Sequence, residues 1–283
     1  ERPIPALGLD LKTYLGNPQR MANGLPMFLL FVGFGHIFVE FKGSIYLLNG
    51  FKWDAAFAEL DRLMHFGTQP WEWLQPLLGF PIITFLINVV YNMWFFVMWM
   101  SWIYFGFAEQ GSVLRTRFFL TYFITWIVGG SAMAIWLSSA GPVYYGRVVG
   151  GADPFAELMQ YLHAANSVLP VWAVDLQEVL WQGHLSNGML GEISAMPSMH
   201  NGTALLFMLA AYQVSRFWGR LMAVNALLIL IGSVHLGWHY AVDGYVAWVL
   251  CYAVWLAAAP VARWWHRQPP QAEFDAALAG ASR

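Results

Sequence analysis

The chain of 283 residues is 59 % hydrophobic and 17 % aromatic, and only 11 % of its residues are charged. An ordinary soluble domain is about one quarter charged, so this composition indicates a polytopic membrane protein. The net charge of -2 leaves no basic surface for nucleic acid. The only cysteine, Cys251, excludes an intrachain disulfide and says nothing about the redox compartment.

A helix that crosses a bilayer needs about 20 mainly apolar residues, and several segments meet this condition. The six predicted spans are 25–48, 80–107, 118–139, 200–217, 221–236 and 243–261. The expected fold is therefore an all-α, polytopic bundle of six transmembrane helices, forming a single membrane domain over 1–283. Within it we expect an N-terminal segment over 1–24, a core over 25–262 and a frayed tail over 263–283.

Ionisable side chains limit the first span. Glu40 and Lys42 are costly inside lipid, so the lipid-buried part is expected to end near Val39 and both residues to lie at the interface.

Two connections between the predicted spans have patterns of their own. Over 51–78, apolar residues such as Trp53 and Phe57 recur at helical spacing among acidic ones, which predicts an amphipathic interfacial helix followed by a Trp71–Trp73 anchor. The long connection over 141–199 contains turn residues and then a mixed helical pattern over 155–181. We expect it to form a cap over one membrane face.

The basic residues predict an orientation. If the amino terminus is cytoplasmic, ten of the 14 basic residues lie inside. These are Arg2, Lys12, Arg20, Arg115, Arg117, Arg216, Arg220, Arg263, Arg267 and Arg283, which leaves Lys42, Lys52, Arg62 and Arg147 outside. This bias follows the positive-inside rule.

Two short stretches carry the candidate chemistry. They are Ala195–Gly202, with the letters AMPSMHNG, and Leu236–Gly244, with the letters LGWHYAVDG. The predicted topology places His200, His239 and Asp243 at span ends on the same outer face. One histidine can attack phosphorus, the other can protonate the departing oxygen, and a carboxylate can orient the attacking ring.

These residues resemble a known family. Pro197–His200 and His239–Asp243 resemble the second and third signatures of the type 2 phosphatidic acid phosphatase superfamily. The region 61–75 is similar to the amino-terminal part of the inositol phosphorylceramide synthase branch. The resemblance implies that His239 is a nucleophile that becomes phosphohistidine, Asp243 its orienting partner and His200 the general acid and later the base.

The chain also departs from the family pattern. Hydrolytic members carry a lysine followed by Arg-Pro in a first motif, and Ser-Arg ahead of the third histidine, where this chain has Gly232-Ser233. Their absence is shared with the inositol phosphorylceramide and sphingomyelin synthases. Arg147 is the only basic residue of the outer connection and is the candidate for a replacement phosphate contact. The other candidate substrate contacts are Ser198, Tyr144, Tyr145 and Tyr240.

The resulting hypothesis is an integral membrane lipid phosphotransferase that acts at the periplasmic or luminal face without metal or cofactor. Its expected partners are a lipid, a small alcohol or water, and the bilayer. A lipid phosphate phosphatase is the first alternative. A transporter or pore with a histidine proton path is the second. His235, His239 and Asp243 would share one face of a continuous helix, so a metal site is a further alternative.

Overall fold

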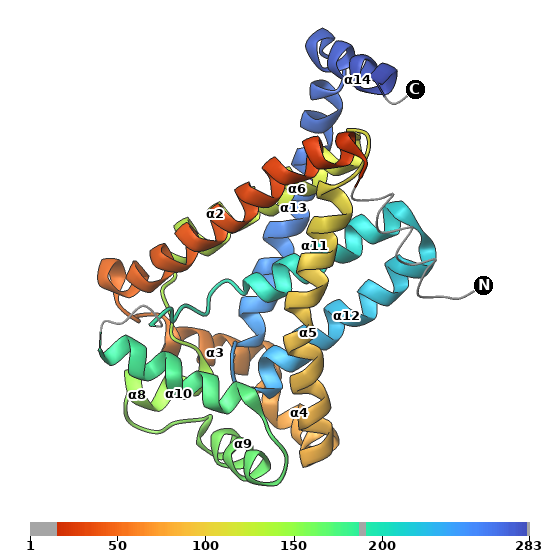
Figure 1. Ribbon diagram of the computed structural model, residues 1–283. Coiled ribbons are helices and arrows are strands. Elements are labelled where there is room, and N and C mark those ends of the chain that lie inside the picture. Colours follow the sequence, from red (N-terminus) through yellow and green to blue (C-terminus); the bar gives the residue numbers. More distant parts are fainter. Residues whose placement is uncertain (1–15, 187–190, 282–283) are drawn as a thin grey trace, which may run out of the picture.

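The computed structural model describes residues 16–186 and 191–281, and within them the chain is built from helices (Figure 1). In this part of the chain, five helices are long and apolar enough to cross a membrane. They are α2 (Pro18–Asn49), α5 (Pro81–Gly106), the continuous stretch Val113–Trp136, α12 (Arg216–His235) and α13 (Ala241–Trp265). The third of these comprises α6 (Val113–Ile127), the π-helical segment η1 (Val128–Met133) and α7 (Ala134–Trp136).

The fourth predicted span is shorter than expected, so the structure has five such helices in its described part where the sequence predicted six. α11 (Met199–Val214) has 16 residues, or about 24 Å of helix, whereas the hydrocarbon core is about 30 Å thick. Every residue from Asn201 to Phe207 is buried, and the helix packs against α12, α13 and α6. The first half of α11 is therefore covered by protein, whereas Tyr212 and Val214 near its end are exposed.

The interfacial segment forms two short helices, which corrects the prediction of one helix over 51–78. α3 (Asp54–Met64) ends at His65, and α4 (Pro70–Leu78) begins after Gln69. Phe66 and Gly67 between them have φ of 58° and 92°, a left-handed conformation that no α-helix can continue through.

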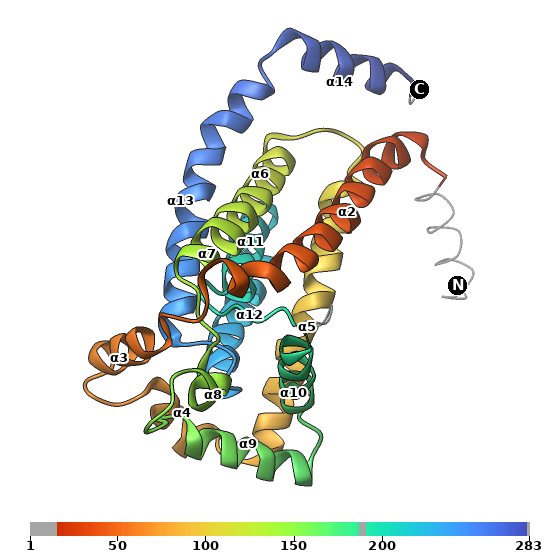
Figure 2. The ribbon, with the colours of Figure 1, turned by 90° about the vertical axis from the view of Figure 1, so that its left-hand side faces the viewer.

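The long connection forms a group of short helices at one end of the bundle. They are η2 (Pro142–Tyr144), α8 (Tyr145–Val148), α9 (Ala156–Val168) and α10 (Trp172–Leu185). α8, α9 and α10 lie at the same end as α3 and α4 (Figures 1 and 2). Residues 187–190 of this connection lie outside the described residues.

The described part of the tail, up to residue 281, is mostly helical, against the expectation of a frayed tail. α13 runs on to Trp265, and α14 covers Pro269–Ala281. α14 is rich in alanine, the strongest helix former. Of the predicted N-terminal segment 1–24, residues 1–15 lie outside the described part, and α2 begins within the remainder.

The orientation predicted from the charges can be checked by cysteine labelling. Cys251 is buried, so we expect the unmodified protein not to react with the thiol reagent. We expect a cysteine at the exposed Ala152 to react with an impermeant thiol reagent in intact cells, and one at the exposed Gln213 not to react. Gly219, on the same predicted inner side, is unsuitable because a Cβ there would lie 2.2 Å from the ring of Tyr212. If only the Gln213→Cys variant were labelled, the protein would have the opposite orientation in the membrane.

Candidate active site

The N-terminal ends of α11 and α13 meet where the two histidine motifs lie. Ser198 is the N-cap of α11, and its hydroxyl accepts hydrogen bonds from the backbone and the side chain of Asn201. The Ser198 N–H donates to the carbonyl of Asp243 at 3.2 Å. The first turns of α11 and α13 are therefore joined directly, which brings His200 near the segment that carries His239.

His239 is oriented by Asp243. Its Nδ1 lies 3.2 Å from Asp243 Oδ2, which also accepts the backbone N–H of Tyr240 at 3.1 Å. Asp243 is fully buried and His239 is only 8 % exposed. Burial, with a smaller contribution from Lys42, lowers the pKa of His239 to about 3, so the imidazole is neutral at pH 7. With Nδ1 engaged by the carboxylate, Nε2 is the ring nitrogen that remains to meet a ligand.

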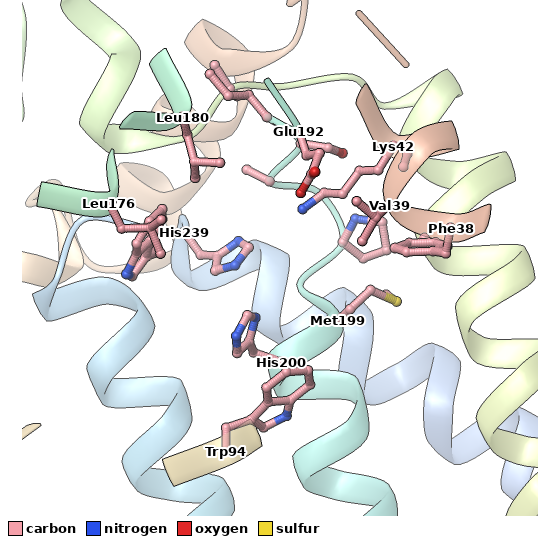
Figure 3. A pocket seen from close by; sticks show the side chains of 18 of the residues that line it. Phe38, Val39, Lys42, Trp94, Leu176, Leu180, Glu192, Met199, His200 and His239 are labelled. Atoms are coloured by element: carbon pink, nitrogen blue, oxygen red, sulfur yellow. The ribbon is translucent and has the colours of Figure 1, made fainter. Parts of the chain in front are cut away.

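His200 faces His239 across a cavity of about 350 Å³ that both side chains line (Figure 3). The centroids of the two imidazole rings are 6.5 Å apart. The His200 ring stacks on Tyr91 at 4.9 Å and lies against Trp94 at 4.1 Å. The aromatic contacts restrict the His200 ring, and the gap between the imidazoles leaves room for a tetrahedral phosphorus centre.

The cavity is lined mainly by apolar and aromatic side chains from α2, α5, α6, η2, α10 and the loops before α11 and α13. They include Phe38, Val39, Tyr91, Trp94, Phe95, Trp126, Tyr144, Leu176, Leu180 and Trp238. Such a lining suits an amphipathic ligand whose polar group reaches the two histidines.

Two buried carboxylates of α3 fix the backbone around the site, and sequence reasoning missed both. Asp54 accepts the N–H groups of Ala140 and Gly141 and the hydroxyl of Tyr240. Asp61 accepts the N–H groups of Ala241 and Val242 at 2.6 and 2.9 Å. Burial raises the pKa of Asp54 and raises that of Asp61 to about 6, while these hydrogen bonds oppose the rise. Their spacing of seven residues, on the face that also carries Phe57, was the available signal.

Removing the Asp54 carboxylate is expected to destabilise the protein strongly. Asp54→Ala leaves two buried N–H groups and a buried hydroxyl without their acceptor, and each such loss costs about 1–3 kcal/mol. Glu59→Ala is the matched control, because Glu59 pairs only with Arg62 on the exposed side of the same helix. In detergent, the thermal unfolding temperature should fall strongly for Asp54→Ala and hardly at all for Glu59→Ala. Equal drops would contradict the role of Asp54.

Of the five predicted substrate contacts, the structure brings only Tyr144 to the histidine cavity. Ser198 is buried as the cap of α11. Tyr145 packs against Phe155 with ring centroids 5.5 Å apart. The Tyr240 hydroxyl donates to Asp54. Ser198 therefore acts on the site through the backbone of α11, and Tyr240 through its hydrogen bond to Asp54.

Arg147 lies apart from the histidines. Its guanidinium pairs with Glu178 at 2.7 Å and lies over the ring of Trp181 at 5.1 Å. It lines a second cavity of about 190 Å³, which shares Tyr144 with the histidine cavity. This arrangement does not bring Arg147 to a phosphate between His200 and His239.

Lys42 and Glu192 are the charged residues that the structure does bring to the histidine cavity (Figure 3). Lys42 was expected at the interface, and Glu192 was not singled out. Burial raises the pKa of Glu192, and the ammonium of Lys42 opposes the rise. The two charges are therefore close enough to interact.

His235 does not join His239 and Asp243. Its Nε2 lies 2.9 Å from the hydroxyl of Thr84, and Gly237, with φ of 72°, separates the two histidine segments. Among the described residues, no group of three or more His, Cys, Asp or Glu side chains is arranged to hold a metal ion.

Comparison with known proteins agrees with the motif resemblance. A model of the PAP2 superfamily, the type 2 phosphatidic acid phosphatases, matches residues 55–257. Searches of curated proteins and of solved structures give no significant match. The matched region contains His200, His239 and Asp243, and it also contains Asp61 of α3. Since the match covers more than half of the chain, this protein belongs to the PAP2 superfamily.

Proposed function

We propose that the protein is an integral membrane lipid phosphotransferase that moves a phospho-headgroup unit through a phosphohistidine on His239. Membership of the superfamily, together with five apolar helices, supports a lipid phosphatase or phosphotransferase. The observation that carries the proposal is the pairing of a carboxylate-oriented His239 with His200 across one cavity.

In the first half-reaction, Nε2 of His239 attacks the lipid phosphorus while the bond to the leaving oxygen breaks. Protonated His200 donates its proton to that oxygen, so an alcohol departs and the phosphoryl unit stays on His239. Asp243 stabilises the positive charge that develops on the His239 ring, because its Oδ2 holds Nδ1–H.

In the second half-reaction, neutral His200 takes the proton of an acceptor hydroxyl as that oxygen attacks phosphorus. The bond between phosphorus and Nε2 breaks, which returns His239 to its neutral form and His200 to its protonated form. An alcohol acceptor gives transfer and water gives hydrolysis.

Transfer is favoured over hydrolysis by two features. The chain lacks the cationic signatures of the hydrolytic members, as do the lipid phosphotransferases of the resembling branch. The mainly apolar and aromatic lining of the cavity also disfavours free water relative to an amphipathic acceptor. A phosphatase is the alternative within the same chemistry. We place the reaction at the periplasmic or luminal face, because the charge bias puts the histidine end of the helices outside.

The test is turnover by the purified protein. Phospholipids and phosphosphingolipids are supplied with and without polyol acceptors, and the products are separated. A new phospholipid that forms only when the acceptor is present supports transfer. Release of a free phosphate or phospho-alcohol at the same rate in both cases supports the phosphatase alternative.

The activity is expected to survive removal of divalent metal ions. A histidine nucleophile with a histidine acid needs no Lewis acid, so prolonged treatment with a chelator should leave the rate unchanged. Assays with and without added zinc or magnesium give the comparison. Loss on chelation and recovery with one of these ions would favour a metal-dependent mechanism.

The transporter alternative predicts a different outcome. A proton path needs ionisable groups distributed across the membrane, whereas His200, His239 and Asp243 meet at one end of the described helices. A protein that conducts ions in liposomes and turns over no lipid would support it.

A further inference from the structure

The histidine cavity contains one positive and one negative side chain. Among the described residues that line it, Lys42 is the only lysine or arginine and Glu192 the only carboxylate. Neither belongs to the two histidine motifs, and Lys42 lies outside the matched region 55–257.

The fold places Lys42 there through the packing of α2. Phe38, four residues earlier and on the same helix face, packs on Gly130 of the π-helical segment η1. A Cβ on Gly130 would lie 2.6 Å from the Phe38 ring, so the close approach of α2 depends on a glycine at this position. This contact holds the next turn of α2, with Lys42, over the cavity.

Lys42 has no ion-pair partner within 4.0 Å among the described residues. The carboxylate of Glu192 interacts electrostatically with the Lys42 ammonium from a longer distance. Figure 3 shows the amino group of Lys42 directed toward Glu192, on the side of the cavity that the two histidines face. A partly buried ammonium without a close partner is costly unless an anion joins it.

We propose that Lys42 binds the phosphate of the lipid and that Lys42 and Glu192 together adapt the cavity to a singly charged phosphodiester. This inference rests on the proposed function and names its substrate class. A phosphodiester carries one negative charge, which the single ammonium balances. A phosphomonoester carries about 1.5 to 2 negative charges at pH 7, and its additional charge meets the carboxylate of Glu192.

The assignment gives each charged group a distinct role. His200 moves the proton and His239 takes the phosphoryl unit. Lys42 supplies a fixed positive charge that holds the phosphate, and Glu192 disfavours a dianion. Phospholipid headgroups attached through a diester are therefore preferred over phosphatidic acid or other lipid monophosphates.

The experiment uses two chromogenic lipids that differ in one charge. The diester is nitrophenyl dodecyl phosphate, and the monoester is a nitrophenyl phosphate with a dodecyl chain on the ring. Both release a nitrophenolate, so kcat and KM are measured by absorbance for the full-length protein in detergent. The variants are Lys42→Met, Lys42→Arg and Glu192→Gln. Lys52→Met is the matched control. The Lys52 ammonium donates a hydrogen bond to Asn49 at the protein surface, and Lys52 does not line the cavity.

We expect the wild type to prefer the diester. Loss of one charge-assisted contact in Lys42→Met should lower kcat/KM for the diester about 10- to 100-fold, mainly through KM. Lys42→Arg should restore most of this loss, and Lys52→Met should match the wild type. Glu192→Gln should raise kcat/KM for the monoester relative to the diester about 3- to 10-fold.

Three results would overturn the inference while leaving the proposed function intact. They are a wild type that prefers the monoester, a Lys42→Met variant with an unchanged KM, and a Glu192→Gln variant with an unchanged substrate ratio. The substrate ratio does not depend on the amount of folded protein, so Glu192→Gln tests the inference even if Lys42→Met folds poorly. If the wild type turned over neither compound nor any lipid of the panel, the proposed function itself would fail.

Discussion

Replacement of His239 by alanine is expected to abolish lipid turnover, with a loss of about 10⁴-fold or more. The nucleophile has no substitute, because no other ring nitrogen in the cavity is held by a carboxylate as Nδ1 of His239 is held by Asp243. Initial rates on a phosphodiester lipid in detergent measure the effect. Glutamine at the same position keeps the polarity without a nucleophilic nitrogen and should be equally inactive.

His163→Ala is the matched control for this variant. His163 is exposed and lines the second cavity, beside Arg147, so its loss should leave the rate unchanged. A His239→Ala protein that unfolds at the wild-type temperature yet keeps normal turnover would remove His239 from the mechanism.

Replacement of His200 by alanine is expected to lower the rate in a way that depends on the leaving group. Loss of a general acid costs about 10²–10⁴-fold when the departing alkoxide must be protonated. A nitrophenolate leaves without that proton, so the defect should shrink when a nitrophenyl diester replaces the natural lipid. The ratio of wild-type to variant kcat on the two substrates is the measurement.

The leaving-group comparison separates acid catalysis from packing. His200 also stacks on Tyr91 and Trp94, so its removal disturbs the cavity wall whatever its chemical role. A purely structural defect would lower the rate equally for substrates with good and with poor leaving groups. That result would contradict the assigned role of His200.

Much of the architecture follows from local pattern. The long apolar runs predicted α2, α5, α12 and α13, and most of their ends were predicted to within a few residues. The reason is that lipid imposes a minimum length on an apolar helix. The two histidine motifs predicted which side chains would meet. The sixth span stays a prediction, because α11 has only 16 residues and its first half is buried against other helices.

The charged residues around the site could not be assigned from the sequence. Asp54 and Asp61 look like part of a polar helix face, and only the fold shows that their partners are backbone groups 86 and 180 residues away. Arg147 is the only basic residue of its connection, which favours it as a phosphate contact, but Glu178 on α10, 31 residues away, pairs with it. The charge of Lys42 predicts an interface position, since nothing in the local sequence reveals that this part of α2 lines the cavity.

The α3 helix gives the site its rigidity. Asp54 connects the loop before η2 to Tyr240, and Asp61 holds the first N–H groups of α13. His239 lies immediately before these anchored residues. The position of the candidate nucleophile is therefore set by a short helix that lies outside the spanning bundle.

The covalent intermediate is the central claim, and trapping it is the most direct test. Wild-type protein is mixed with the nitrophenyl dodecyl diester, quenched in base within the first turnover and digested for mass spectrometry. We expect a dodecyl phosphate group on His239, labile to acid, and no such group in His239→Gln. Full turnover with no modified histidine, or modification of His200 in place of His239, would contradict it.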